Sequence, residues 1–101
     1  MVERKKFMVA GLHGNRTVEA EQFATFAHYI QNVQFRFVVT HVPGDPAICV
    51  THRDSGKRVC AIPFASIQAA LGDYEAAAQS ALKATIERAG EARVRAVLSA
   101  A

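Results

Sequence analysis

The stretch from residue 34 to residue 62 contains a near-repeat that constrains the fold more than any other feature of the chain. The pattern Val-Thr-His, followed by seven residues and a cysteine, occurs at residues 39–49 and again at residues 50–60. Turn-forming residues interrupt each copy, at 43–46 and at 54–56. Runs rich in Val, Ile, Phe and Thr that are separated by such clusters are typical of hairpins. The stretch therefore predicts a three-stranded antiparallel meander over residues 34–41, 47–52 and 57–62.

Side chains alternate between the two faces of a strand, so the meander has a bulky face and a mixed face. A turn with Gly56 in the left-handed conformation places Val50 opposite Cys60 and Ile48 opposite Ile62. These residues join Phe35, Phe37, Val39 and His41 on the bulky face, which we expect helices to cover. The mixed face has a narrow apolar stripe with basic and hydroxyl neighbours and is a candidate binding surface. The stripe consists of Val38, Cys49 and Val59.

The residues before the meander predict a strand and a helix. Residues 6–12 form a short apolar run that predicts a strand. Asn15 or Thr17 is placed to cap a helix that ends near Asn32, with acidic residues in its first turn. Its buried stripe follows helical spacing and consists of Phe23, Phe26, Ala27, Ile30 and Val33.

The residues after the meander predict three helices. Pro63 ends the last strand and can begin a helix over residues 64–71, which stops at Gly72. Asp73 caps a second helix, and Gly90 separates it from a third over residues 91–100. One side of the second helix is formed by Tyr74, Ala78, Ala81, Leu82 and Ile86. The chain is thus expected to form one α+β domain over residues 1–101: a two-layer structure with a three- to four-stranded antiparallel sheet and helices on one face.

The composition limits the classes of protein to which this chain can belong. The chain has 101 residues, of which 50% are hydrophobic and 21% charged, as in ordinary globular domains. Its apolar runs are too short to span a membrane, and the N-terminal run lacks a processing site, so we expect neither a membrane protein nor a signal peptide. Cys49 and Cys60 are predicted to lie on opposite faces and therefore not to form a disulfide. We expect a reducing, cytoplasmic location.

The near-repeat also raises the question of zinc, because it supplies two histidines and two cysteines, the usual structural ligands. The predicted register places His52 and Cys60 on one face and Cys49 on the other, which argues against a shared ion. We therefore expect that His41, Cys49, His52 and Cys60 do not form a metal site, and that the protein has no cofactor.

The sequence gives only weak support to two other kinds of site, a phosphate-binding loop and an enzyme active site. Residues 11–16, GLHGNR, lie between the predicted strand and the predicted helix, where backbone N–H groups can hold an anion. They lack the Lys-Ser/Thr of a P-loop and the third glycine of a dinucleotide turn, which favours a connector; His13 and Arg16 would be the residues of a phosphate cradle. No spacing pairs a nucleophile with a base, so we do not expect an enzyme.

The charge distribution points to nucleic acid. The formal net charge is +3, and the cations gather at the N-terminus and on the second hairpin. A hairpin tip that projects cations can contact phosphates. The predicted phosphate-binding residues are Arg36, Arg53, Lys57 and Arg58, together with the N-terminal arm Arg4, Lys5 and Lys6.

The predicted order of helix, three strands and helix over residues 17–82 resembles the double-stranded-RNA-binding domain in topology only. That family places a lysine pair at the start of its last helix, where this chain has Pro63-Phe64-Ala65-Ser66. The resemblance therefore does not extend to the family's main phosphate contact and does not imply membership.

The alternative function is protein–protein interaction without catalysis. The C-terminal helices are rich in alanine, which contributes little burial, so they must approach other elements closely or find larger side chains. Val94, Val97 and Leu98 form a second apolar stripe beyond Gly90. We expect a second copy of the chain to cover this stripe in a two-fold dimer.

Overall fold

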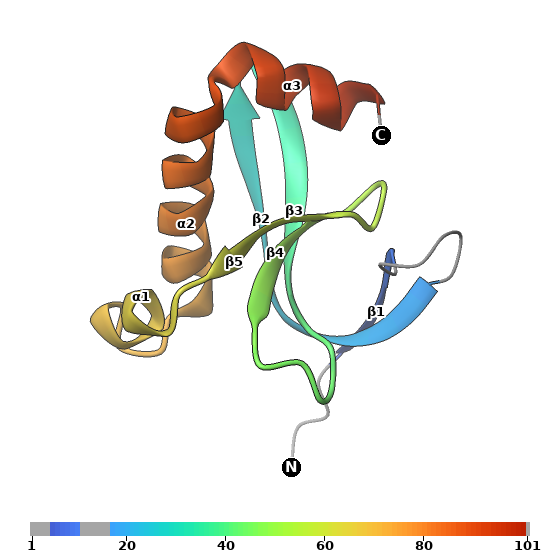
Figure 1. Cartoon of the computed structure of the whole chain (residues 1–101), viewed down its shortest axis with the longest axis vertical. Helices are drawn as coiled ribbons and strands as arrows, with labels where there is room; N and C mark the ends of the chain where they lie inside the picture. The colour runs from blue at the N-terminus through green and yellow to red at the C-terminus, as the bar shows by residue number, and fades with distance from the viewer. Residues whose placement is uncertain (1–4, 11–16, 101) are drawn as a thin grey trace.

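One antiparallel sheet contains five strands in the order β1-β2-β3-β4-β5, and three helices follow it in the chain (Figure 1). This computed structural model describes residues 5–10 and 17–100, with side chains from residue 19 onward. The helices pack on one face of the sheet, which confirms the two-layer α+β class. The strands are β1 (Lys5–Ala10), β2 (Thr17–Ile30), β3 (Val33–His41), β4 (Ile48–His52) and β5 (Arg58–Ile62), and the helices are α1 (Phe64–Ala69), α2 (Tyr74–Ala89) and α3 (Glu91–Ala100).

The predicted helix over residues 17–32 is wrong, because this segment is the long strand β2. Its apolar residues fit helical spacing, but Ala24, Phe26, His28 and Ile30 also alternate, as a strand requires. Gln31 and Asn32 both adopt positive φ, at 48° and 66°, and form a two-residue turn that pairs Ile30 with Val33. The resemblance to the double-stranded-RNA-binding domain, which required a helix here, is therefore lost.

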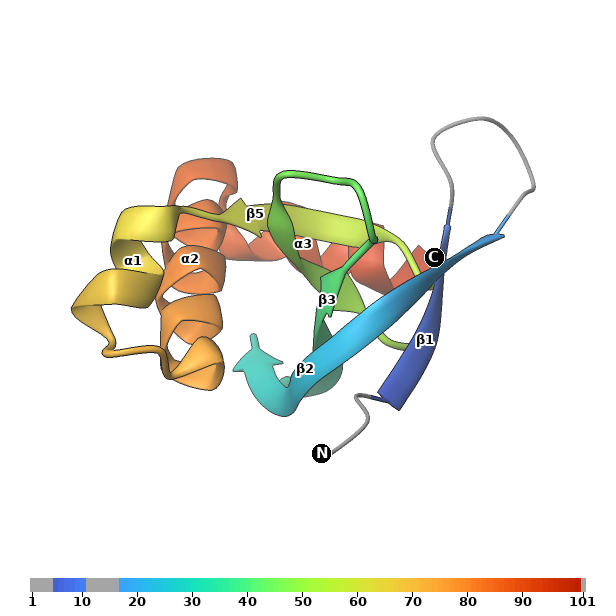
Figure 2. The same ribbon diagram turned by 90° about the horizontal axis from the view of Figure 1, so that it is seen from below.

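A register shift between Gln22 and Ala24 bends β2 near its middle. Such a bulge adds one residue to a strand and increases its local twist. Both views show β1 and the first part of β2 curving away from the side occupied by α1 and α2 (Figures 1 and 2). The sheet therefore has one face covered by helices and one strongly curved face that the helices leave uncovered.

The predicted meander is confirmed, and its register is confirmed away from the turn that joins β4 to β5. Val50 pairs with Cys60 and Ile48 with Ile62, and Gly56 has φ 71° in the connecting turn. A register shift between Val50 and Thr51 makes Thr51 pair with Arg58, so Val59 is the extra residue of a bulge. Val59 packs against the core shared with the helices, and its predicted place in the stripe on the mixed face is wrong.

The core lies between the bulky sheet face and the helices. Phe37 stands at its centre, fully buried, with its ring centroid 5.4 Å from that of Phe26 on the neighbouring strand. Leu82 is fully buried on α2. Asp73 caps this helix by accepting a hydrogen bond from the Ala76 N–H at 3.1 Å, as predicted. None of the described helices is long and apolar enough to cross a membrane.

Candidate functional site

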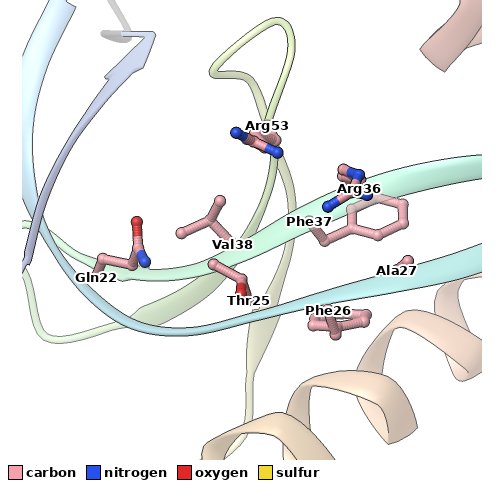
Figure 3. Close-up of a pocket in the computed structure, with 8 residues that line it drawn as sticks. All are labelled: Gln22, Thr25, Phe26, Ala27, Arg36, Phe37, Val38 and Arg53. Atoms are coloured by element: carbon pink, nitrogen blue, oxygen red, sulfur yellow. The ribbon is translucent and has the colours of Figure 1, made fainter.

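Two of the predicted arginines meet at a cavity on the helix-free face. Arg36 lies in β3, and Arg53 follows the last residue of β4. Their backbones are joined directly, because the Arg53 N–H donates to the Arg36 carbonyl oxygen at 3.0 Å. Both side chains are exposed and line a cavity of about 600 Å³. Figure 3 shows both guanidinium groups on the side of the sheet away from Phe26.

Strand β2 supplies the polar residues of the same cavity. Gln22 and Thr25 line it beside the two arginines, and none of the eight residues drawn in Figure 3 is acidic. Thr25 pairs with Val38, and Ala27 pairs with Arg36, so these four side chains lie next to one another on one face of β2 and β3. On β2, Thr25 and Ala27 belong to one row of alternate residues. Gln22 and Thr25 were not predicted as site residues, because residues 17–32 were expected to form a helix. The alternation of residues 24–30 was the signal that could have identified their face.

Two of the other predicted cations, Lys57 and Arg58, do not line this cavity. Arg58 forms an ion pair with Asp45, 3.2 Å from Nη1 to Oδ2, so its charge is balanced within the protein. Lys57 is exposed but lines a second cavity, next to α3. In β1, Lys5 pairs with Gln22 and Lys6 with Glu21, which brings the backbone of the predicted arm beside the first cavity. Arg4 lies outside the described residues.

The two residues of the predicted apolar stripe that remain on the mixed face, Val38 and Cys49, are buried and do not form an exposed binding surface. Val38, Thr40, Cys49 and Thr51 are all buried. The two threonine hydroxyls form a hydrogen bond of 2.8 Å across β3 and β4. Burial also raises the pKa of the Cys49 thiol, with Arg58 acting in the opposite direction to a smaller extent. This part of the face is therefore a second small core, and the open surface lies beside it, at Arg36 and Arg53.

The four histidine and cysteine residues of the near-repeat are distributed over both faces. His52 is buried beside the rings of Phe35 and Phe37, and its Nδ1 lies 2.8 Å from Ser55 Oγ. Burial lowers the pKa of His52, and the nearby Asp54 partly opposes this. Cys49 lies on the opposite face, as predicted, and both cysteines are free. Within the described part of the chain, no group of three or more His, Cys, Asp or Glu residues is arranged to hold a metal ion.

Residues 11–16, which include His13 and Arg16 of the possible phosphate cradle, lie outside the described residues. The element that follows them is the strand β2. The expected phosphate cradle needs the N-terminus of a helix directly after these residues, and a strand stands there instead.

Two of the three residues in the apolar stripe of α3 pack inside the protein's own core. Val94 and Leu98 are buried in the core cluster, contrary to the reasoning that this chain leaves them without a core. Val97 alone of the three is exposed, at 60%. It lines a cavity of about 220 Å³ with Val59, Lys57 and Arg93 among its neighbours.

One exposed aromatic side chain lies in the row of Thr25 and Ala27. Tyr29 is 65% exposed and pairs with Gln34 on β3. The sequence analysis did not assign it, because a helix would have placed it on a different surface from Arg36.

Comparison of the chain with protein-family models, with curated proteins and with solved structures finds no match. The function is therefore inferred from the geometry of the site.

Proposed function

We propose that the protein binds nucleic acid through the phosphate backbone, on the helix-free face of the sheet. The observation that carries this proposal is the meeting of Arg36 and Arg53 at an open cavity whose described lining includes no acidic side chain. Of the predicted cations of the hairpin tip, Arg53 stays at the centre of the site, together with Arg36, whereas Arg58 is already paired with Asp45.

The chemistry of the cavity suits a phosphate diester. A guanidinium is always charged, and its planar array of donors matches two phosphate oxygens at once. Two such groups, one on β3 and one directly after β4, repel each other, and an anion between them relieves this repulsion. The Thr25 hydroxyl and the Gln22 amide add uncharged donors at the same cavity. A cavity open to solvent also admits a continuous chain of phosphates rather than one small ion.

The net charge of the chain supports the same conclusion. At +3, the protein attracts polyanions at long range, and this attraction weakens as salt is added. The described surface near the cavity then provides the local contacts that orient the ligand.

Replacing both arginines, R36Q/R53Q, should weaken binding to random-sequence 20-nucleotide DNA and RNA by at least about tenfold at low salt. Each lost phosphate contact lowers the slope of log K against log salt by about 0.7–0.9. The double variant should thus flatten the slope by about 1.4–1.8. Fluorescence anisotropy of labelled oligonucleotides, measured over a series of salt concentrations, provides both quantities.

A matched control is K83Q/R95Q, which removes the same charge from exposed positions on α2 and α3 that do not line the cavity. If the control weakens binding as much as R36Q/R53Q does, only the overall charge matters and the site is wrong. Absence of binding to any oligonucleotide at low salt would overturn the function itself.

Self-association through α3 is a second candidate function, favoured by the exposed Val97 beside an apolar cavity. Because Val94 and Leu98 are already buried, Val97 is the only residue of the predicted interface stripe left for a partner. Sedimentation of the wild type and of Val97→Ser at high micromolar concentration tests it: a dimer that the substitution dissociates supports the proposal, and a wild-type monomer excludes it.

A further inference from the structure

The side chain of Tyr29 is exposed on the same sheet face as the arginine site. Strand alternation places residues 25, 27 and 29 of β2 on one face, and Phe26, His28 and Ile30 on the other. Phe26 and Ile30 are buried in the core with the helices. Thr25 and Ala27 line the arginine cavity. Tyr29 is therefore the next side chain of this row.

The fold itself makes little use of this ring. Tyr29 is 65% exposed, whereas its neighbours Ile30 and His28 face the interior side of the sheet. The other large hydrophobic residues that are exposed, Phe64, Leu71 and Val97, lie in or beside helices. Among the described residues, Tyr29 is thus the exposed aromatic ring on the open sheet face.

The register sets the distance between the ring and the cation. Arg36 pairs with Ala27, and Tyr29 pairs with Gln34, so Tyr29 and Arg36 are diagonal neighbours across β2 and β3. Diagonal neighbours on one sheet face are about 7–8 Å apart, within reach of aromatic and other long side chains. The other two positions of this four-residue patch are Ala27, which carries only a methyl group, and the exposed Gln34. This spacing suits a nucleotide whose base lies on the ring while its phosphate meets the guanidinium.

We propose that the preferred ligand is single-stranded nucleic acid, with one unpaired base stacked on Tyr29 and the adjacent phosphates held by Arg36 and Arg53. This inference rests on the proposed function and names its ligand class. In a duplex the faces of the bases are covered by their neighbours, so an aromatic side chain on a sheet can stack only on an unpaired base. Stacking tolerates any base, because every base has a π face.

The chain offers a direct optical probe of this contact. It contains two tyrosines and no tryptophan, and Tyr74 is half-buried on α2 beside Phe23. In the background Tyr74→Phe, all tyrosine emission comes from Tyr29. Titration with a 20-nucleotide oligothymidylate should quench this emission, after correction for absorption by the oligonucleotide. A duplex of the same length should quench it much less.

Affinity variants test the same contact independently. Tyr29→Ala should weaken binding of the single strand on the order of tenfold, and Tyr29→Phe should retain it, because the ring provides the stacking. Neither change should alter the salt slope, which reports the phosphate contacts. Phe64→Ala is the matched control, since it removes another exposed aromatic ring, on α1. Circular dichroism checks that each variant is folded.

The outcomes separate the two proposals. If the protein binds single strands and duplexes equally and Tyr29→Ala changes neither, this inference is overturned while the arginine site stands. If R36Q/R53Q leaves binding unchanged but Tyr29→Ala weakens it, the arginine site is wrong. If no oligonucleotide binds, both proposals fail.

Discussion

Replacing Phe37 by alanine should lower the free energy of unfolding by about 3–5 kcal/mol, the usual range for a core phenylalanine. Phe37 is 0% exposed, and its ring contacts Phe26 and His52. The substitution removes apolar burial and leaves a cavity that the strands on either side cannot close. Because domains of this size are stable by only about 5–15 kcal/mol, this loss is a large fraction of the total, and the variant should unfold at a markedly lower urea concentration.

Urea unfolding followed by circular dichroism measures this loss. Phe64→Ala provides the comparison, because Phe64 is 72% exposed and its removal should change the stability by about 0.5 kcal/mol or less. A loss at Phe37 below about 1 kcal/mol would show that the ring is not at the centre of a packed core and would contradict the fold described above.

Thr40 and Thr51 form the buried hydroxyl pair of the second small core. The effect on stability of substituting one of them should depend strongly on whether the other is also substituted. Thr40→Val removes one partner of the buried 2.8 Å hydrogen bond and leaves the Thr51 hydroxyl buried without it. Such a group lowers stability by about 1–3 kcal/mol. Adding Thr51→Val replaces the second hydroxyl by a methyl of similar shape, and the double variant should recover most of the loss.

A double-mutant cycle in urea measures this recovery. The coupling between the two sites should be about 1–2 kcal/mol, within the range found for residues in contact. Additive losses would mean that the hydroxyls do not interact. They would therefore contradict the hydrogen bond between Thr40 and Thr51.

Local signals in the sequence were sufficient for the meander and for the C-terminal helices. Turn residues such as Gly56 and capping residues such as Asp73 act over a few positions, and their preferred conformations are the ones found. The pairs Val50 with Cys60 and Ile48 with Ile62 were predicted from the turn residues, but Thr51 pairs with Arg58, one residue earlier than the predicted register requires. The bulge at Val59 was missed, since an extra residue in a strand leaves no mark in the pattern.

The candidate site was predicted only in part. Arg36 and Arg53 were expected to contact phosphates, but their meeting at one cavity depends on the pairing of β3 with β4. The ion pair between Arg58 and Asp45 joins the start of β5 to the turn between β3 and β4, and sequence spacing does not show it. Tyr29, Thr25 and Gln22 were not assigned, because their face is defined only once β2 is known to be a strand.

The sequence by itself determined the α+β class, the meander with its register beyond the bulge, the helix boundaries near Asp73 and Gly90, and the bulky face under the helices. Each of these depends on residues that are close in the chain. Only the tertiary structure decided the state of residues 17–30, whose apolar residues suit a helix and a strand equally well. Pairing with β3 selects the strand, because it places Phe26 against Phe37 and joins the backbone of β2 to the sheet. That same pairing creates the open face and, with it, the site we propose.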